Sequence, residues 1–211
     1  MASNILRSTR RVLWGMVLLA TAVGGWIWYS SLSAPARPSV AQRLADSGDG
    51  QYGAGDYQLV THRGQVIDDS IFLGKPSLVF FGFTHCPDVC PTTLGDMQYW
   101  LSRLGEDADK IQVFFVTTDP ERDTVDVMAE YVSWFSDDIT GLTGNADEMA
   151  EMVSAWGVYT RKVPIDGGGY NVDHTASVFM LDRDGRFFGT IAYEEDREIA
   201  FTKVRRLADE G

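Results

Sequence analysis

The chain has 211 residues, 45% of them hydrophobic, and a formal net charge of −12, so it is long enough for one domain with a buried core. Three of the 18 basic residues are arginines that lie before residue 12. The rest of the chain therefore has 15 basic and 30 acidic side chains, a net charge of about −15. A surface this acidic repels nucleic acid and anionic lipid headgroups, which excludes a nucleic-acid-binding protein.

An uncharged run near the N-terminus predicts a membrane anchor. Residues 12–32 contain no charged side chain, and as a helix they would be about 31 Å long, which matches the apolar core of a bilayer. Three arginines precede the run, and acidic residues begin only at Asp46. Because basic residues stay on the cytoplasmic side, residues 1–11 are predicted to be cytoplasmic and the rest to face the periplasm or an equivalent compartment.

Two other interpretations of this segment stay open. The small residues at 31–36 are compatible with cleavage of a signal peptide, and residues 9–13 weakly resemble a twin-arginine signal. The apolar run is long for a signal peptide, so we favour an uncleaved, single-pass anchor in the inner membrane. In all three interpretations, the residues that follow this segment are exported from the cytoplasm.

A linker and one domain follow the predicted anchor. Residues 33–55 are rich in Ser, Ala, Pro and Gly and lack a periodic apolar pattern, which predicts a linker. The domain is predicted over 56–211. Its first element is a short hairpin, with strands at 57–61 and 65–68 around Gly64.

The central part of the domain alternates strands and helices. Residues 78–83 and 111–117 are apolar runs, as expected of strands that are buried on both faces. Helices are predicted at 91–104, 124–135 and 146–156, the first two from apolar residues at helical spacing.

The chain ends with a hairpin and a helix. Strands at 177–181 and 186–191 flank Asp184 and Gly185, which are a strong turn signal, and a helix is predicted at 199–207. The order of the predicted strands and helices along the chain indicates an α/β domain with a mixed central sheet flanked by helices. It is the order of a thioredoxin-like fold with a helical insertion before the last hairpin.

The two cysteines of the chain, Cys86 and Cys90, lie between a predicted buried strand and the N-terminus of a helix. A disulfide between them would close a very small loop and add little stability, even though an exported protein commonly carries disulfides. A helix N-terminus lowers the pKa of a nearby thiol, and sites in α/β sheets gather at the carboxyl ends of strands. The pair is therefore predicted to be a redox couple or a pair of metal ligands.

The spacing of this pair favours metal binding. Thioredoxin-type oxidoreductases have two residues between their cysteines and this chain has three, although a disulfide remains possible after a backbone adjustment. Two thiolates favour Cu(I), Zn(II) or an iron–sulfur cluster, but structural zinc and such clusters usually take four protein ligands. Two cysteines and one histidine make a three-ligand site, which copper accepts well.

Three histidines are candidates for the third ligand. His174 precedes the last predicted hairpin, in a segment that faces the cysteine loop in a thioredoxin fold, and we favour it. His85 adjoins Cys86, but neighbouring side chains of an extended loop point apart. His62 lies in the first hairpin and is expected to be exposed. Asp173 is a candidate to orient the His174 ring, or else to cap a turn.

Three separated motifs resemble the Sco/SenC family of copper proteins. They are residues 83–92 around the cysteine pair, residues 119–124 (Asp-Pro-Glu-Arg-Asp-Thr) and residues 173–176 (Asp-His-Thr-Ala). The single N-terminal anchor is also similar, and the resemblance covers essentially all of 56–210.

This resemblance implies a thioredoxin-like fold that binds copper, as Cu(I) or Cu(II), through Cys86, Cys90 and His174. Family members help to assemble the binuclear copper centre of cytochrome c oxidase. The implied function is that of a metallochaperone, which receives copper from a donor and delivers it to cytochrome c oxidase subunit II. Some members are thought to act instead as thiol–disulfide reductases on the cysteines of that target, which would require a periplasmic thiol reductant.

The metallochaperone is the function that we favour. Three protein ligands leave the metal accessible to a partner's thiolate, provided that both thiols are reduced. In the reductase alternative Cys86 would attack, but no proline adjoins His174, where thioredoxins carry one. A peroxidase or redox sensor would need a cation near Cys86, which Arg122 or Arg161 would have to supply. The chain is therefore predicted to be a carrier rather than an enzyme.

Overall fold

The computed structural model describes Trp14 and residues 50–211. The predicted cytoplasmic segment (1–11), the rest of the predicted anchor (12–32) and the predicted linker as far as residue 49 lie outside the described residues. Within the described residues, no helix has both the length and the apolar character needed to cross a membrane.

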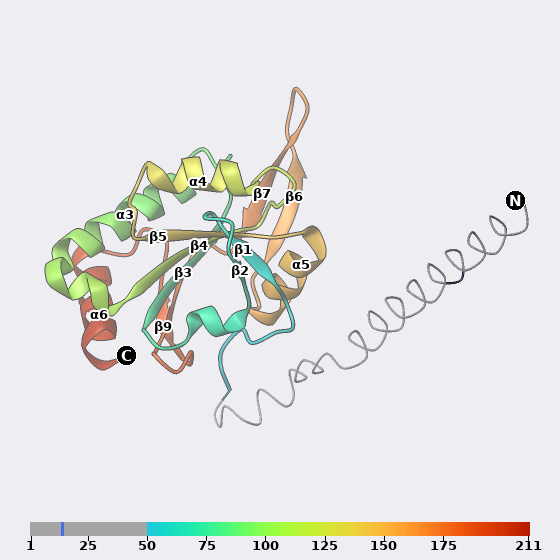
Figure 1. Cartoon of the computed structure of the whole chain (residues 1–211). Coiled ribbons are helices and arrows are strands. Elements are labelled where there is room, and N and C mark those ends of the chain that lie inside the picture. The colour runs from blue at the N-terminus through green and yellow to red at the C-terminus, as the bar shows by residue number, and fades with distance from the viewer. Residues whose placement is uncertain (1–13, 15–49) are drawn as a thin grey trace, which may run out of the picture. The chain divides into compact units, whose positions relative to one another are not determined.

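Seven strands of the described residues form one mixed sheet, in the order β2-β1-β5-β4-β3-β8-β9 (Figure 1). At its centre, β3 (Ser77–Gly82) runs parallel to β4 (Gln112–Thr117). On the other side of β3 lie β8 (Val178–Leu181) and then β9 (Phe187–Ile191), in antiparallel pairing. Both β3 and β4 are buried almost throughout, which confirms the prediction from their apolar runs.

The other half of the sheet contains a strand that the sequence did not predict. This strand, β5 (Ile139–Thr143), runs parallel to β4 and antiparallel to β1 (Leu59–Thr61), and β1 pairs with β2 (Val66–Ile67) in the expected first hairpin. β5 is only five residues long and has Gly141 at its middle. Residues 139–143 form a strand because they pair with β4 and β1. The sequence of these five residues gives no sign of that pairing.

Two separate cores cover the two faces of the sheet, because side chains alternate along each strand. On one face, Leu78 and Phe80 of β3 belong to a core with buried side chains of three helices. These helices are α3 (Val89–Leu104), α4 (Val125–Ser133) and α6 (Arg197–Glu210).

On the opposite face, Val79 and Phe81 belong to a core with α5 (Ala146–Ala155) and the 3-10 helix η1 (Asp69–Phe72). Trp156, which follows α5, is 1% exposed and meets the Phe81 ring edge-on at a centroid distance of 5.3 Å. The sheet is therefore buried on both sides at its centre, where β3 leads to the cysteine loop.

The predicted helices are confirmed, with ends that differ by a few residues. α3 begins at Val89, and Pro91 lies in its first turn, where a missing N–H costs nothing. α6 begins earlier than predicted because the Asp196 carboxylate accepts N–H groups of its first turn. A 3-10 helix, η2 (Gly105–Lys110), connects α3 to β4.

The insertion before the last hairpin is helical only in part, which corrects the prediction. After α5 comes a second hairpin, β6 (Thr160–Pro164) and β7 (Tyr170–His174), which projects from the domain (Figure 1). The glycines at 167–169 form its turn, and all three have positive φ angles. Because most side chains of β6 are exposed, these strands lack the apolar alternation by which the other strands were predicted.

Residues 50–55, which were predicted to end the linker, contact the domain. The Tyr52 ring meets Trp156 edge-on at 5.4 Å, and the Tyr52 hydroxyl donates to the Trp156 carbonyl at 2.9 Å. From β3 to α6, the element order and the mixed sheet are those of a thioredoxin-like α/β fold.

Candidate metal centre

The loop between β3 and α3 carries both cysteines as free thiols. Cys90 lies in the first turn of α3 and is completely buried, whereas Cys86 is half-buried. The backbone N–H of Cys90 donates to the Cys86 sulfur at 3.4 Å. Cys86 is thus the more accessible thiol, and it lies at the N-terminus of a long helix, which favours its thiolate.

His174 reaches this pair from the last position of β7. Its Nε2 lies 3.6 Å from the Cys90 sulfur, and the three potential ligand atoms all lie within 4.8 Å of one another. Its Nδ1 lies 3.0 Å from the Thr175 carbonyl oxygen, which only accepts, so Nδ1 carries the hydrogen and the lone pair of Nε2 faces the sulfurs. The rings of Phe80 and Phe83 meet the imidazole edge-on at 6.0 and 5.8 Å and hold its orientation.

The two other histidines lie outside this group. His85 is exposed, and its Nδ1 lies 3.0 Å from the Thr84 hydroxyl. His62 is half-buried and accepts the N–H of Gly141 at 2.9 Å. Burial lowers the pKa of His62, and the charge of Arg63 lowers it further. The expectation that His62 is exposed was wrong, because its contact is with β5, the strand that was not predicted.

Asp173 does not orient the His174 ring, which corrects that interpretation. Its carboxylate pairs with Arg161 at 2.8 Å, directly across the β6–β7 hairpin. The Thr175 carbonyl holds the imidazole instead. A backbone carbonyl has no signal in the sequence, so this partner was visible only in the fold.

The two thiols differ strongly in acidity. The hydrogen bond from the Cys90 thiol lowers the pKa of Cys86 to about 4; burial opposes this, and the neighbouring His174 and backbone hydrogen bonds from Asp88 and Cys90 add to the lowering. The same sulfur–sulfur hydrogen bond, burial and the charge of Cys86 raise the pKa of Cys90. At neutral pH the pair therefore holds one thiolate, on Cys86, and one thiol, on Cys90.

Gly82, the last residue of β3, makes room for the buried sulfur. A Cβ atom at this position would lie 2.7 Å from the Cys90 sulfur and 2.7 Å from a ring carbon of Phe115. Gly82 lies within the strand predicted at 78–83, where no role was predicted for it. A glycine inside an apolar strand commonly marks a close approach, and that signal was available.

A buried carboxylate anchors the cysteine loop to the end of β4. Asp123, which is fully buried, accepts the backbone N–H of Thr84 at 3.0 Å and the Thr84 hydroxyl at 2.6 Å. It also accepts the Thr117 hydroxyl at 2.6 Å. These three bonds fix the residues just before Cys86 against the sheet.

A second buried carboxylate connects the same region to β7. Asp119 pairs with Arg122 and accepts the Tyr170 hydroxyl at 2.7 Å. Arg122 donates to the Tyr170 carbonyl at 3.1 Å and stacks on the Tyr170 ring at 4.0 Å. Its guanidinium lies 5.8 Å from the centre of the Phe83 ring. Residues of the 119–124 motif, which had no predicted role, thus hold the cysteine loop and the histidine strand together.

A cavity of about 400 Å³ opens at two of the three candidate ligands. Cys86 and His174 line it, together with other residues of the cysteine loop and of β7 and its continuation: Phe83, Pro87, Asp88, Val89, Asn171, Val172, Asp173 and Ala176. A metal ion or the side chain of a partner therefore has access to the site from solvent.

Comparisons with known proteins point to one family. A family model described as SCO1/SenC matches residues 45–209. The bovine "Protein SCO2 homolog, mitochondrial" is 35% identical over 90% of this chain and 72% of its own length. The chain spans 60–74% of the length of the mitochondrial relatives that it matches.

Two solved structures are similar in fold and sequence. Bradyrhizobium japonicum ScoI with copper bound has 42% identity and a TM-score of 0.68, over 73% of this chain and 98% of that one. Yeast Sco1 with copper bound has 32% identity and a TM-score of 0.68, over 75% of this chain and 89% of that one.

We predict that Cys86 of the reduced, metal-free chain reacts with iodoacetamide at a nearly constant rate from pH 8 to pH 6. With a pKa of about 4 it remains a thiolate over this range, whereas a thiol of ordinary pKa would lose roughly 80-fold of its thiolate. Fragment-ion mass spectrometry gives the rate at each cysteine, and buried Cys90 is the internal control that should stay unmodified. A rate at Cys86 that falls tenfold per pH unit would contradict the prediction.

Gly82→Ala is expected to destabilise the chain by about 1–3 kcal/mol and to make Cys90 reactive, because the added methyl group displaces its sulfur. Gly95→Ala in α3 is the matched control: a Cβ there meets nothing within 4 Å, and the helix gains up to about 1 kcal/mol. Urea unfolding and alkylation of Cys90 measure both effects. Equal stability of the two variants, with Cys90 unreactive in both, would show that Gly82 is not required.

Proposed function

The chain belongs to the SCO1/SenC family, and from this premise we propose that it is a metallochaperone that binds one copper ion through Cys86, Cys90 and His174. One observation carries the proposal: two sulfurs and an imidazole nitrogen from distant parts of the chain lie within 4.8 Å of one another. The copper-bound structures of ScoI and Sco1, which are similar to this chain, support copper as the metal.

The donor set suits copper in its chemistry and in its size. A three-coordinate ion with bonds of about 2.0–2.3 Å separates its ligand atoms by about 4 Å, and the Cys90 sulfur lies 3.6 Å from His174 Nε2. Two soft thiolates favour Cu(I), and the imidazole allows Cu(II) as well. Cys86 is already a thiolate and Nε2 already presents a lone pair, so binding requires the loss of one proton, from Cys90.

The arrangement of the three ligands suits delivery of the metal. Cys90 is buried and His174 is held by Phe80, Phe83 and the Thr175 carbonyl, so both are fixed, whereas Cys86 lies on the open side of the cavity. An incoming thiolate would reach the metal beside Cys86 and replace the ligands one at a time. A site with three ligands keeps a coordination position free for that exchange.

The recipient in this proposal is the copper-centre domain of cytochrome c oxidase subunit II. The domain would work on the periplasmic face of the inner membrane, or an equivalent side, held by the anchor at 12–32 and loaded by a copper donor. In that oxidising compartment a thiol reductant would have to keep Cys86 and Cys90 reduced before loading. The resemblance of the three motifs supports this assignment, and the uncharged run of the sequence supports the location.

A second candidate function, thiol–disulfide reduction, is favoured by the unequal acidity of the cysteines. The Cys86 thiolate would attack a disulfide of the target and form a mixed disulfide, releasing one target thiolate. Cys90 would then lose its proton and attack the Cys86 sulfur, which frees the second target thiol and leaves Cys86 and Cys90 joined. An external thiol reductant would restore the pair. The peroxidase alternative has no such support, since Arg122 and Arg161 are paired with carboxylates.

We predict that the reduced chain binds one copper ion and that Ala substitution of Cys86, Cys90 or His174 weakens binding by more than about 100-fold, because each removes a direct ligand. Competition with a chromophoric chelator measures the affinity, and metal analysis gives the stoichiometry. His85→Ala is the matched control and should bind copper like the wild type. Full copper retention by His174→Ala would disprove the three-ligand site.

The two functions are separated by offering the chain two forms of a subunit II fragment. A metallochaperone transfers copper to the fragment with reduced cysteines, and His174→Ala should abolish that transfer. A reductase instead reduces the oxidised fragment, and His174→Ala should retain most of that activity because the imidazole exchanges no electrons. Rapid disulfide reduction without any copper transfer would replace the metallochaperone by the reductase.

A further inference from the structure

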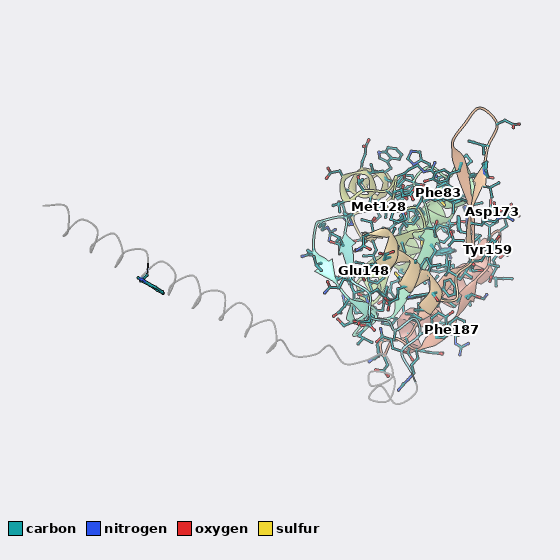
Figure 2. All side chains as sticks on the ribbon, turned by 90° about the vertical axis from the view of Figure 1, so that its right-hand side faces the viewer. Phe83, Met128, Glu148, Tyr159, Asp173 and Phe187 are labelled. Atoms are coloured by element: carbon teal, nitrogen blue, oxygen red, sulfur yellow. The ribbon has the colours of Figure 1, made fainter. Side chains whose placement is uncertain are left out.

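A second concave surface borders the same hairpin as the metal site. This groove, of about 460 Å³, lies between α5 and β6, and we call it the α5–β6 groove. Its wall is mostly apolar and includes Met149, Ala150 and Val153 of α5 together with Val158 and Tyr159. Tyr159 is 54% exposed, and Figure 2 shows it on the side of the molecule from which the hairpin projects. The metal-site cavity is bordered by β7, so the two strands carry one concave surface each.

The hydrogen bonds of the hairpin alternate along β6. The N–H of Thr175 donates to the Tyr159 carbonyl at 3.0 Å, and the N–H of Ile165 donates to the Gly169 carbonyl at 3.3 Å. Positions that bond to the partner strand alternate with positions that point away from it in an antiparallel pair. The odd-numbered residues of β6 therefore direct their backbone groups toward β7.

Thr160 and Lys162 accordingly direct their backbone N–H and C=O groups away from β7, and both residues line the α5–β6 groove. Within the part of the chain that the structure describes, nothing bonds to these four groups. Pro164 has no N–H, so the free edge of β6 ends there. An unpaired strand edge is a template for the addition of another strand.

An unpaired strand edge beside an apolar helix face fits an extended peptide. The edge supplies main-chain hydrogen bonds, and the groove supplies apolar contacts for alternate side chains. We propose that an extended segment of the copper-receiving partner adds to the edge of β6 and fills the α5–β6 groove. This docking proposal rests on the proposed function for the identity of the partner.

Charge adds a further requirement for that segment. The three acidic residues of α5 do not line the groove: Glu148 and Glu151 accept the backbone N–H groups of Gln58 and Asp56, and Asp147 lies in the first turn of the helix. Among the described residues that line the groove, Lys162 is the one basic side chain, and it is paired with Glu121 at 2.6 Å. The segment therefore has apolar side chains at alternate positions for the groove, and basic residues at its ends suit the net negative charge of the whole chain.

Docking at this edge would place the partner close to the metal. Thr160 of β6 is the direct register partner of His174 in β7. Strands in a sheet are about 4.8 Å apart, so an added strand would lie about 10 Å from the strand that carries His174. A partner held at that distance presents its thiolates at high effective concentration without covering the metal-site cavity.

The test uses the reduced, metal-free full chain and a synthetic peptide, Lys-Lys-Val-Thr-Val-Thr-Val-Lys. Hydrogen–deuterium exchange should show protection of the backbone amides of Thr160 and Lys162 when the peptide is added. Thr160→Pro removes the outward N–H and should weaken peptide binding about tenfold, whereas Thr160→Ala retains it and should bind like the wild type.

Ala150→Gln should fill the groove and weaken peptide binding, and Ala129→Gln on α4 is its matched control.

Three outcomes would overturn the docking proposal. The first is protection elsewhere on the domain, and the second is equal peptide affinity in Thr160→Pro, Ala150→Gln and the wild type. The third is that, in the absence of peptide, the protection of β6 rises with the concentration of the chain, which would make a second copy of the chain the occupant.

Copper titration of the same samples reports separately on the proposed function. Copper binding without peptide protection at β6 would remove only the docking proposal, and protection without copper binding would remove only the metallochaperone.

Discussion

The complete burial of the Cys90 sulfur is the constraint on which the rest of the site depends. A thiol in that position is shielded from solvent, so its proton is directed to the Cys86 sulfur, and its sulfur lies 3.6 Å from His174 Nε2. The same contact makes Cys86 a thiolate near neutral pH and leaves Cys90 protonated. The glycine at position 82 makes room for the sulfur, because a Cβ atom there would lie 2.7 Å from it.

Two buried carboxylates keep the three ligand segments in register. Asp123 holds the residues before Cys86 against β4, and Asp119 with Arg122 holds Tyr170 at the start of β7. Buried charges are costly to desolvate, and partners that satisfy them recover that cost without a large net gain in stability. Their effect here is geometric: they fix the distance between the cysteine loop and the strand that ends at His174.

The β6–β7 hairpin connects the two proposals. Its inner strand carries a candidate ligand, and the outer strand has an unpaired edge beside an apolar groove. The hairpin projects from the domain, and its contacts with residues 119–122 stabilise its position: Lys162 pairs with Glu121, and Tyr170 bonds to Asp119 and Arg122. An added strand would stabilise it further and would do so next to His174.

Local patterns in the sequence were sufficient for the central strands, the four described helices, the two hairpins with apolar strands and the cysteine pair at a helix N-terminus. Each depends on periodicity or spacing within about a dozen residues, and hydrophobic burial follows such periods directly. Local patterns were not sufficient to choose His174 as the third ligand; that choice also used the expected fold and the resemblance of three separated motifs.

Only the tertiary structure decided the positions of β5 and of the β6–β7 hairpin, since short or exposed strands are defined by their partners. It also decided the half-buried state of His62, the pairing of Asp173 with Arg161 and the role of Gly82 behind Cys90. Each of these is a contact between residues far apart in the chain, and no local pattern records which distant groups will meet.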